Sequence, residues 1–178
     1  IRVLPAEFDD TSYIRLSLLA KGETNPRGGL LGVKIENNNA NNSLGQRLVV
    51  NVKRNGDASS PNYILSNTGF SQLSGSYYTR YKHAKSLFSL TGSAYVQQLG
   101  ILSASHIGNL TDLNKALASD TPLVNKPFTY SIQPPSQLIQ HYAGKLKWEL
   151  ESELFGKIIT SYTLQENHRQ EFDNHRGD

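Results

Sequence analysis

The feature that most constrains the fold is a strict alternation of apolar and polar residues that recurs along the chain. Ile14, Leu16 and Leu18 alternate with polar residues, and the same period of two runs through residues 31–35, 48–52, 128–132, 142–150 and 158–164. A period of two places successive side chains on opposite faces of a strand. We therefore predict an all-β fold, an antiparallel β-sandwich with Greek-key-like connections and one short helix, with Trp148 in its core.

Turn residues separate these segments. Residues 25–29 are rich in Gly, Pro and Asn, residues 55–57 read Asn-Gly-Asp, and residues 153–156 are expected to join the last two strands into a hairpin. Residues 71–105 carry a weaker pattern, from which we expect one or two strands. A helical period occurs in residues 110–117, where leucines lie three and four apart and Asn109 or Thr111 is available as the N-cap.

Length and composition indicate one domain. A chain of 178 residues can form a single β-sandwich, so we expect residues 1–178 to be one β-sandwich domain with a flexible polar tail at 167–178. The absence of cysteine excludes a disulfide framework. The net charge of +3 does not imply nucleic acid as a partner. Since no apolar run has the length of a membrane-spanning helix, no membrane insertion is expected.

The sequence does not favour an enzyme. It contains no nucleophile elbow, zinc-protease motif, phosphate-binding loop or dinucleotide fingerprint, and its five histidines lack metal-ligand spacing. Neither a cofactor nor a metal is expected. Glu149, Glu151 and Glu153 could form a cation site or an acid/base pair. We prefer the interpretation that they lie on a solvated face opposite Trp148, together with Lys145 and Lys147.

One cluster has the composition of a contact surface. Residues 77–85 interleave aromatic and basic side chains, a mixture that stacks on rings and binds anionic groups. Within it the candidate receptor-binding residues are Tyr77, Tyr78, Arg80, Tyr81 and Lys82. The alternative is an edge strand whose tyrosine rings pack inward while its basic groups remain solvated.

The C-terminal tripeptide Arg176-Gly177-Asp178 is a second receptor-binding candidate. Integrins bind this tripeptide when a mobile loop displays it, and the polar tail would leave both charged side chains accessible. The interpretation that we prefer is that three common residues occur together by chance.

In order along the chain, several segments resemble the head (knob) domain of an adenovirus fibre. Residues 13–22, 30–34 and 45–56 are similar to its early strands, Gly69-Phe70 followed by Tyr77 to its Gly-Phe segment, and residues 142–152 with 159–164 to its aromatic final hairpin. The Thr-Leu-Trp-Thr entry of the family is missing, no proline follows Phe70, and a charged tail extends past Leu164. The likeness is therefore to a distant or non-human member.

The resemblance implies a function. A fibre head is a homotrimeric β-sandwich at the tip of the capsid fibre, on the virion surface. It is made in the host cell and attaches the virion to a host cell-surface receptor, which is a protein or a sialylated glycan.

Two alternatives come from other classes. Residues 142–150 also resemble the terminal Trp-x-Leu strand of bacterial cell-wall-binding (WxL-like) domains, although Trp148 is the single tryptophan and a further strand follows it. A small hydrolase on a β scaffold is the other alternative, with no residue constellation behind it.

Overall fold

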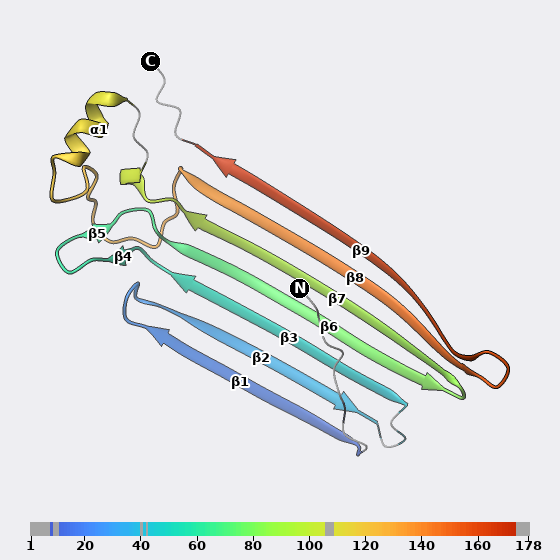
Figure 1. Ribbon diagram of the computed structural model, residues 1–178. Helices are drawn as coiled ribbons and strands as arrows, with labels where there is room; N and C mark the ends of the chain where they lie inside the picture. Colours follow the sequence, from blue (N-terminus) through green and yellow to red (C-terminus); the bar gives the residue numbers. More distant parts are fainter. Residues whose placement is uncertain (1–7, 9–10, 40, 42, 106–108, 174–178) are drawn as a thin grey trace.

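The protein is described here from a computed structural model, which defines residues 8, 11–39, 41, 43–105 and 109–173. Its main feature is one seven-stranded antiparallel sheet (Figure 1). The sheet contains β1 (Tyr13–Glu23), β2 (Gly28–Asn38), β3 (Leu44–Asn55), β6 (Phe70–His83), β7 (Ser86–Gly100), β8 (Ser136–Ser152) and β9 (Gly156–Phe172). The short strands β4 (Ala58–Ser59) and β5 (Ile64–Leu65) form a second, two-stranded sheet. The helices are η1 (Ser103–Ser105) and α1 (Leu110–Leu117).

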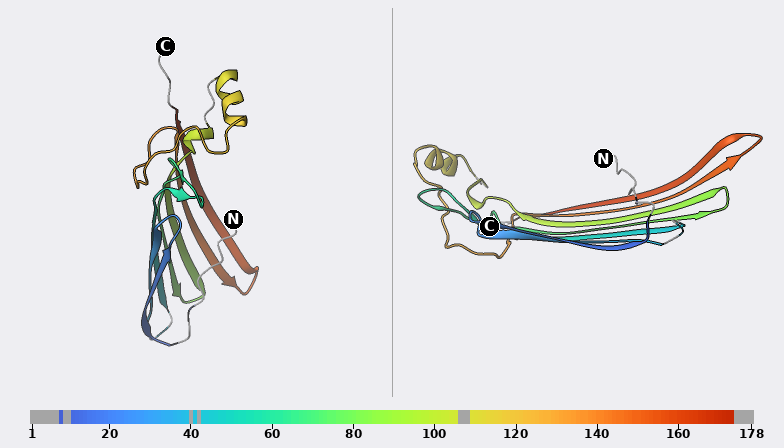
Figure 2. Two further views of the ribbon diagram at one scale, coloured as in Figure 1. Left: turned by 90° about the vertical axis from the view of Figure 1, so that its left-hand side faces the viewer. Right: turned by 90° about the horizontal axis from the view of Figure 1, so that it is seen from below.

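The predicted all-β class, with antiparallel pairing and one short α-helix, is confirmed. The predicted Greek-key-like connections are wrong, because the seven strands of the large sheet lie in sequence order, β1-β2-β3-β6-β7-β8-β9, with the separate β4–β5 pair between β3 and β6 in the chain. Viewed along its edge, the large sheet is a single, gently curved layer (Figure 2).

The alternating segments at 14–18, 31–35, 48–52, 142–150 and 158–164 are strands, as predicted. Residues 71–105 contain most of β6 and β7. The terminal hairpin is also confirmed, and its turn ends at Gly156, whose φ of +70° is a conformation that glycine adopts without steric cost. Strand β9 continues to Phe172, so residues 167–172 belong to the sheet and not to the flexible tail that we predicted.

The helix α1 has the bounds that the leucine spacing predicts. Asn109 is its N-cap, and the Oδ1 atom of Asn109 accepts a hydrogen bond of 2.8 Å from the backbone N–H of Asp112. None of the helices in the described part of the chain combines the length and the apolar character that crossing a membrane as a helix requires.

The predicted strand at residues 128–132 is wrong, since this segment is an extended connection across the end of the sheet. Its alternation has another cause. The Phe128 ring contacts the ring of Tyr130 edge-on at 5.1 Å and lies under the guanidinium of Arg27 at 4.3 Å. It also fills the space where Gly56 has no side chain, because a Cβ there would lie 2.3 Å from the Phe128 ring.

The two ends of the sheet differ. At one end, the long-connection end, β3 joins β6 through residues 56–69 and β7 joins β8 through residues 101–135, which carry α1 (Figure 1). At the other, the short-turn end, Ala84 and Lys85 join β6 to β7, and residues 153–155 join β8 to β9.

Little of the apolar surface is buried. Among the described residues, Phe8 is the one large apolar side chain that is buried, with 8% of its surface exposed, whereas Ile14, Leu18 and Leu31 expose 80%, 74% and 66%. The prediction that Trp148 lies in a core is wrong for this single chain, where the indole is half-buried. In the described part of the chain, no second layer of similar area covers the faces of the large sheet, so most of its apolar side chains stay exposed.

Candidate functional site: two faces and one ordered end

One face of the large sheet carries a continuous band of apolar side chains, which we call the apolar belt. Paired residues in neighbouring strands share a face, so the register assigns its members. They are Ile14, Leu16, Leu18, Ala20, Leu31, Val33, Ile35, Leu48, Val50, Val52, Leu73, Tyr77, Tyr81, Phe88, Leu90, Ala94, Val96, Tyr142, Leu146, Trp148, Leu150, Ile158, Tyr162 and Leu164.

The apolar belt is level over most of the sheet and shifts toward the short-turn end at β8 and β9. Ile35 and Leu164 lie in one row of paired residues, yet Ile35 is the last belt residue of β2 before Asn37, and Leu164 is the last of β9 before Glu166. From β1 to β7 the border at the long-connection end is level, because Ala20, Leu31, Val52, Leu73 and Val96 lie in one row. Across β8 and β9 this border moves by four residues toward the short-turn end, to Tyr142 and then Leu164.

Aromatic side chains lie at the short-turn border of the apolar belt. Tyr81, Phe88 and Trp148 are paired in one row across β6, β7 and β8. The rings of Phe88 and Trp148 stack at 6.3 Å, and the indole N–H donates to the Oγ atom of Ser86 at 3.3 Å. Tyr81 and Trp148 each combine an apolar ring with a polar O–H or N–H group. Such amphipathic rings suit a boundary between apolar and aqueous surroundings.

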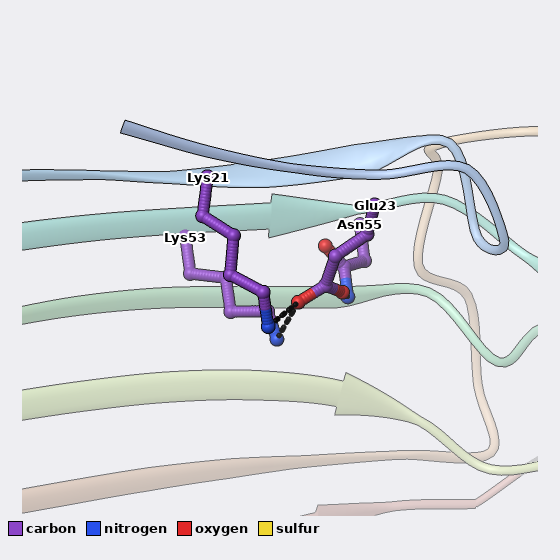
Figure 3. A network of polar contacts seen from close by, with 4 residues as sticks. All are labelled: Lys21, Glu23, Lys53 and Asn55. Carbon is purple, nitrogen blue, oxygen red and sulfur yellow. Dashed lines mark hydrogen bonds and ion pairs between the residues drawn. The ribbon is translucent and has the colours of Figure 1, made fainter. Parts of the chain in front are cut away.

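The opposite face is polar and carries ion-pair networks. Near the long-connection end, a Glu23 carboxylate oxygen lies 3.0 Å from Lys53 Nζ and 3.4 Å from Lys21 Nζ, and its other oxygen accepts a 2.9 Å hydrogen bond from Asn55 (Figure 3). The bonds from Lys53 and Asn55 lower the pKa of Glu23 below its ordinary value. This network connects β1 and β3 across β2.

A second network surrounds Glu36, which is 2% exposed. Its carboxylate lies 2.9 Å from Lys34 Nζ and accepts a 2.7 Å hydrogen bond from Arg47 Nε. Burial alone would raise the pKa of Glu36, but the hydrogen bonds from Lys34 and Arg47 outweigh it and hold the pKa below its usual range.

The short-turn end of the polar face holds a pocket of about 230 Å³, whose charged lining comes from β6, the following turn, β8 and β9. Glu149 lies in its wall with 12% of the side chain exposed, and its oxygens are 2.6 Å from Lys147 Nζ and 2.6 Å from Lys157 Nζ. Both hydrogen bonds lower the pKa of Glu149, and its carboxylate raises the pKa of Lys157. Glu149 lies opposite Trp148, on the face that we predicted.

The long-connection end is ordered by a buried asparagine. The two hydrogens of Asn67 Nδ2 are shared among the carbonyl oxygens of Ile101, Gln133 and Pro135 at 2.8–2.9 Å, and Asn67 Oδ1 accepts from the N–H of Gln133 at 2.9 Å. Asn67 has a φ of +65°, which asparagine tolerates better than most residues. One side chain thus connects both long connections.

A buried aspartate does the same at a second point. Asp57, 1% exposed, accepts from the backbone N–H of Thr68 at 2.9 Å and from that of Thr129 at 3.2 Å. Its own N–H donates to the carbonyl oxygen of Thr129 at 3.0 Å. Polar bonds, in place of an apolar core, therefore order this end of the sheet.

The predicted contact cluster is divided between the two faces. Tyr77 and Tyr81 belong to the apolar belt, whereas Tyr78, Arg80 and Lys82 lie on the polar face, with Arg80 and Lys82 lining the pocket. The predicted Arg176-Gly177-Asp178 site lies outside the described residues. Sequence reasoning missed Asn67 and Asp57, because Asn and Asp are common in turns and nothing local distinguishes a buried one.

Across the residues that the structure defines, no group of three or more His, Cys, Asp or Glu side chains is placed to hold a metal ion. No family model, curated protein or solved structure matches the chain.

Proposed function

We propose that this chain is a membrane-embedded binding module whose apolar belt contacts the hydrocarbon of a lipid bilayer and whose long-connection end is presented to a ligand. The observation that carries the proposal is the exposed apolar belt on one face of the sheet, with Tyr81, Phe88 and Trp148 in one row near its short-turn border. The proposal departs from our expectation of no membrane insertion, which relied on continuous apolar runs. A strand needs an apolar residue at only every second position to give one apolar face.

The height of the apolar belt fits the thickness of a bilayer. Strands that span membranes tilt by about 35–45°. On β7 the apolar belt runs from Phe88 to Val96, about 26 Å at ~3.3 Å per residue. With that tilt its height is about 20 Å, close to the ~25 Å of apolar surface that a bilayer requires.

The borders of the apolar belt also fit a bilayer. Tyr and Trp concentrate where hydrocarbon meets headgroups, and Tyr81 and Trp148 lie at the short-turn border with Phe88 between them. On β9 the polar residues Glu166 and His168 follow Leu164 at the other border. In hydrocarbon each unpaired backbone group costs several kcal/mol, so the proposal requires the outer edges of β1 and β9 to pair with further strands.

Long connections on a rigid sheet are the usual place for ligand contacts. Asn67 and Asp57 order these connections without an apolar core, so the segments between them are presented in a defined shape. The receptor-attachment function that the fibre-head resemblance implies uses the same kind of surface. The two functions differ in what covers the apolar belt. In a homotrimer it would be two further copies of the chain, and in the present proposal it is lipid.

The test compares two neighbouring leucines of β1 that are both exposed, Leu18 in the apolar belt at 74% and Leu19 on the polar face at 58%. Arginine at the middle of a bilayer costs a strand about 2–4 kcal/mol. Leu18→Arg should therefore weaken insertion into phosphatidylcholine vesicles by about 30- to 1,000-fold, and Leu19→Arg should change it by less than about threefold. The amount of folded, vesicle-bound protein is measured after refolding.

Trp148 fluorescence supplies a second reading. Lipids brominated near the headgroup should quench it more strongly than lipids brominated at the acyl-chain end, because Trp148 lies at the border of the apolar belt. Discrete particles of three chains in lipid-free buffer, with no quenching by either lipid, would overturn the proposal and favour the homotrimer.

A further inference from the structure

The polar face holds a contact between an aromatic ring and two arginines. The ring is that of Phe8, which is buried, whereas most leucines of the apolar belt are exposed. The Phe8 ring stacks on Tyr78 with 6.0 Å between centroids and 20° between planes. The guanidinium carbons of Arg80 and Arg47 lie 4.8 Å and 5.8 Å from its centroid. Gly45 completes the site, since a Cβ there would lie 2.9 Å from two Phe8 ring carbons.

The two arginines at the Phe8 ring favour an aromatic ring that has negative charge beside it. Guanidinium groups attract the face of a ring, and they attract carboxylates more strongly. In the sequence Phe8 is preceded by Glu7 and followed by Asp9 and Asp10. Arg47 also binds the carboxylate of Glu36, so the charge complementarity with the acidic neighbours of Phe8 comes mainly from Arg80 of β6.

We propose that Gly45, Arg47, Tyr78 and Arg80 form a docking site for an acidic, aromatic peptide segment, and that the segment around Phe8 is its resident ligand. Among its described residues, Phe8 fills the site, while Thr11 and Ser12 bond to Asn38 of β2. A peptide of the same chemistry can therefore replace it when Phe8 is absent. This inference does not depend on what covers the apolar belt.

The first experiment measures chymotrypsin cleavage after Phe8, normalised to cleavage after Phe155, which is 73% exposed in the β8–β9 turn. Gly45→Ala places a methyl group in the ring site and should speed cleavage after Phe8 at least tenfold. The matched control is Gly92→Ala, where an added Cβ meets nothing within 4 Å, and it should leave the rate unchanged. Equal rates in both variants would overturn the proposal.

The second experiment adds a labelled peptide of residues 1–12 to the full chain. It should bind the Phe8→Ala protein at least tenfold more tightly than the wild type, whose site is filled, and more weakly as salt is raised. The same peptide with Phe8→Ala is the matched control and should not bind. Arg80→Lys in the Phe8→Ala protein keeps the charge but loses the planar group, and should weaken binding several-fold. Equal binding of both peptides, or equal binding to wild type and Phe8→Ala proteins, would overturn the proposal.

Discussion

Phe88 and Trp148 lie directly opposite each other on β7 and β8, with their rings stacked at 6.3 Å and 15° between planes. One edge of the indole is fixed by its hydrogen bond to Ser86. The pair therefore has a defined orientation on a surface that this chain alone leaves partly exposed.

Substitution of Trp148 tests that arrangement. A stacked pair contributes about 0.5–1.5 kcal/mol beyond burial. Trp148→Ala should therefore lower the free energy of unfolding by about 1–2 kcal/mol in detergent micelles, and Trp148→Phe, which keeps a ring on Phe88, by less than about 1 kcal/mol. Denaturant titration measures both. A loss of about 3–5 kcal/mol, typical of a fully buried tryptophan, would show that another protein surface covers the residue.

Asn67 offers a test of the long-connection end. Asn67→Gly tolerates the φ of +65° but loses all the side-chain bonds to residues 101, 133 and 135. Buried groups left without partners cost about 1–3 kcal/mol each, so Asn67→Gly should lower stability by at least about 2 kcal/mol. It should also make residues 101–135 sensitive to protease before the sheet unfolds. Simultaneous loss of the sheet and the connection would contradict this picture of a separately ordered end.

Acid should weaken the ion-pair network of Glu36. Because the pKa of Glu36 is lower in the folded chain than in the unfolded chain, the unfolded chain binds more protons between the two pKa values. The stabilisation is present above the unfolded pKa of about 4.3 and is lost as the pH falls through the folded value. Unfolding titrations at pH 7 and pH 3 should show a smaller difference for Glu36→Gln than for wild type. Asn37→Gln, at an exposed and uncharged position of the same strand, is the control and should keep the wild-type difference.

The β8–β9 turn depends on the left-handed conformation of Gly156. Gly156→Ala should lower the free energy of unfolding by about 1 kcal/mol, because alanine pays a steric cost at positive φ. Gly156→Asn should cost less. Nothing lies within 4 Å of the Cβ added at Gly156, so crowding does not contribute. Thermal unfolding of the two variants in parallel checks the order, and an alanine variant as stable as the wild type would contradict it.

The sequence was most informative where a strand keeps one strictly apolar face. This is why residues 14–18, 31–35 and 48–52 were placed correctly, whereas β6 and β7, with serine, glycine and glutamine between their apolar residues, were only partly recognised. In the segment 128–132 the alternation does not come from a strand. Phe128 and Tyr130 alternate because one side of a connection packs on Arg27 and Gly56, and a period of two cannot distinguish that from a strand.

The site was harder to predict for a related reason. Alternation reveals that Leu16 and Ser17 point to opposite faces, but not whether protein, lipid or water covers each face. The cluster at residues 77–82 is not one surface. The same alternation places Tyr77 and Tyr81 on the apolar face and Tyr78 and Arg80 on the polar face. Asn67 and Asp57 act through partners more than 60 residues away in sequence, Gln133 and Thr129, and no local pattern indicates such contacts.

The sequential order of the strands has a consequence for how such a chain can evolve. Because the strands of the large sheet lie in sequence order, a hairpin such as β8–β9 could be duplicated or deleted as one genetic segment without rethreading the remainder. The paired strands beside it would keep their register, and the newly joined edges would offer the same backbone groups. A gene encoding this architecture can therefore change the width of its sheet in steps of two strands.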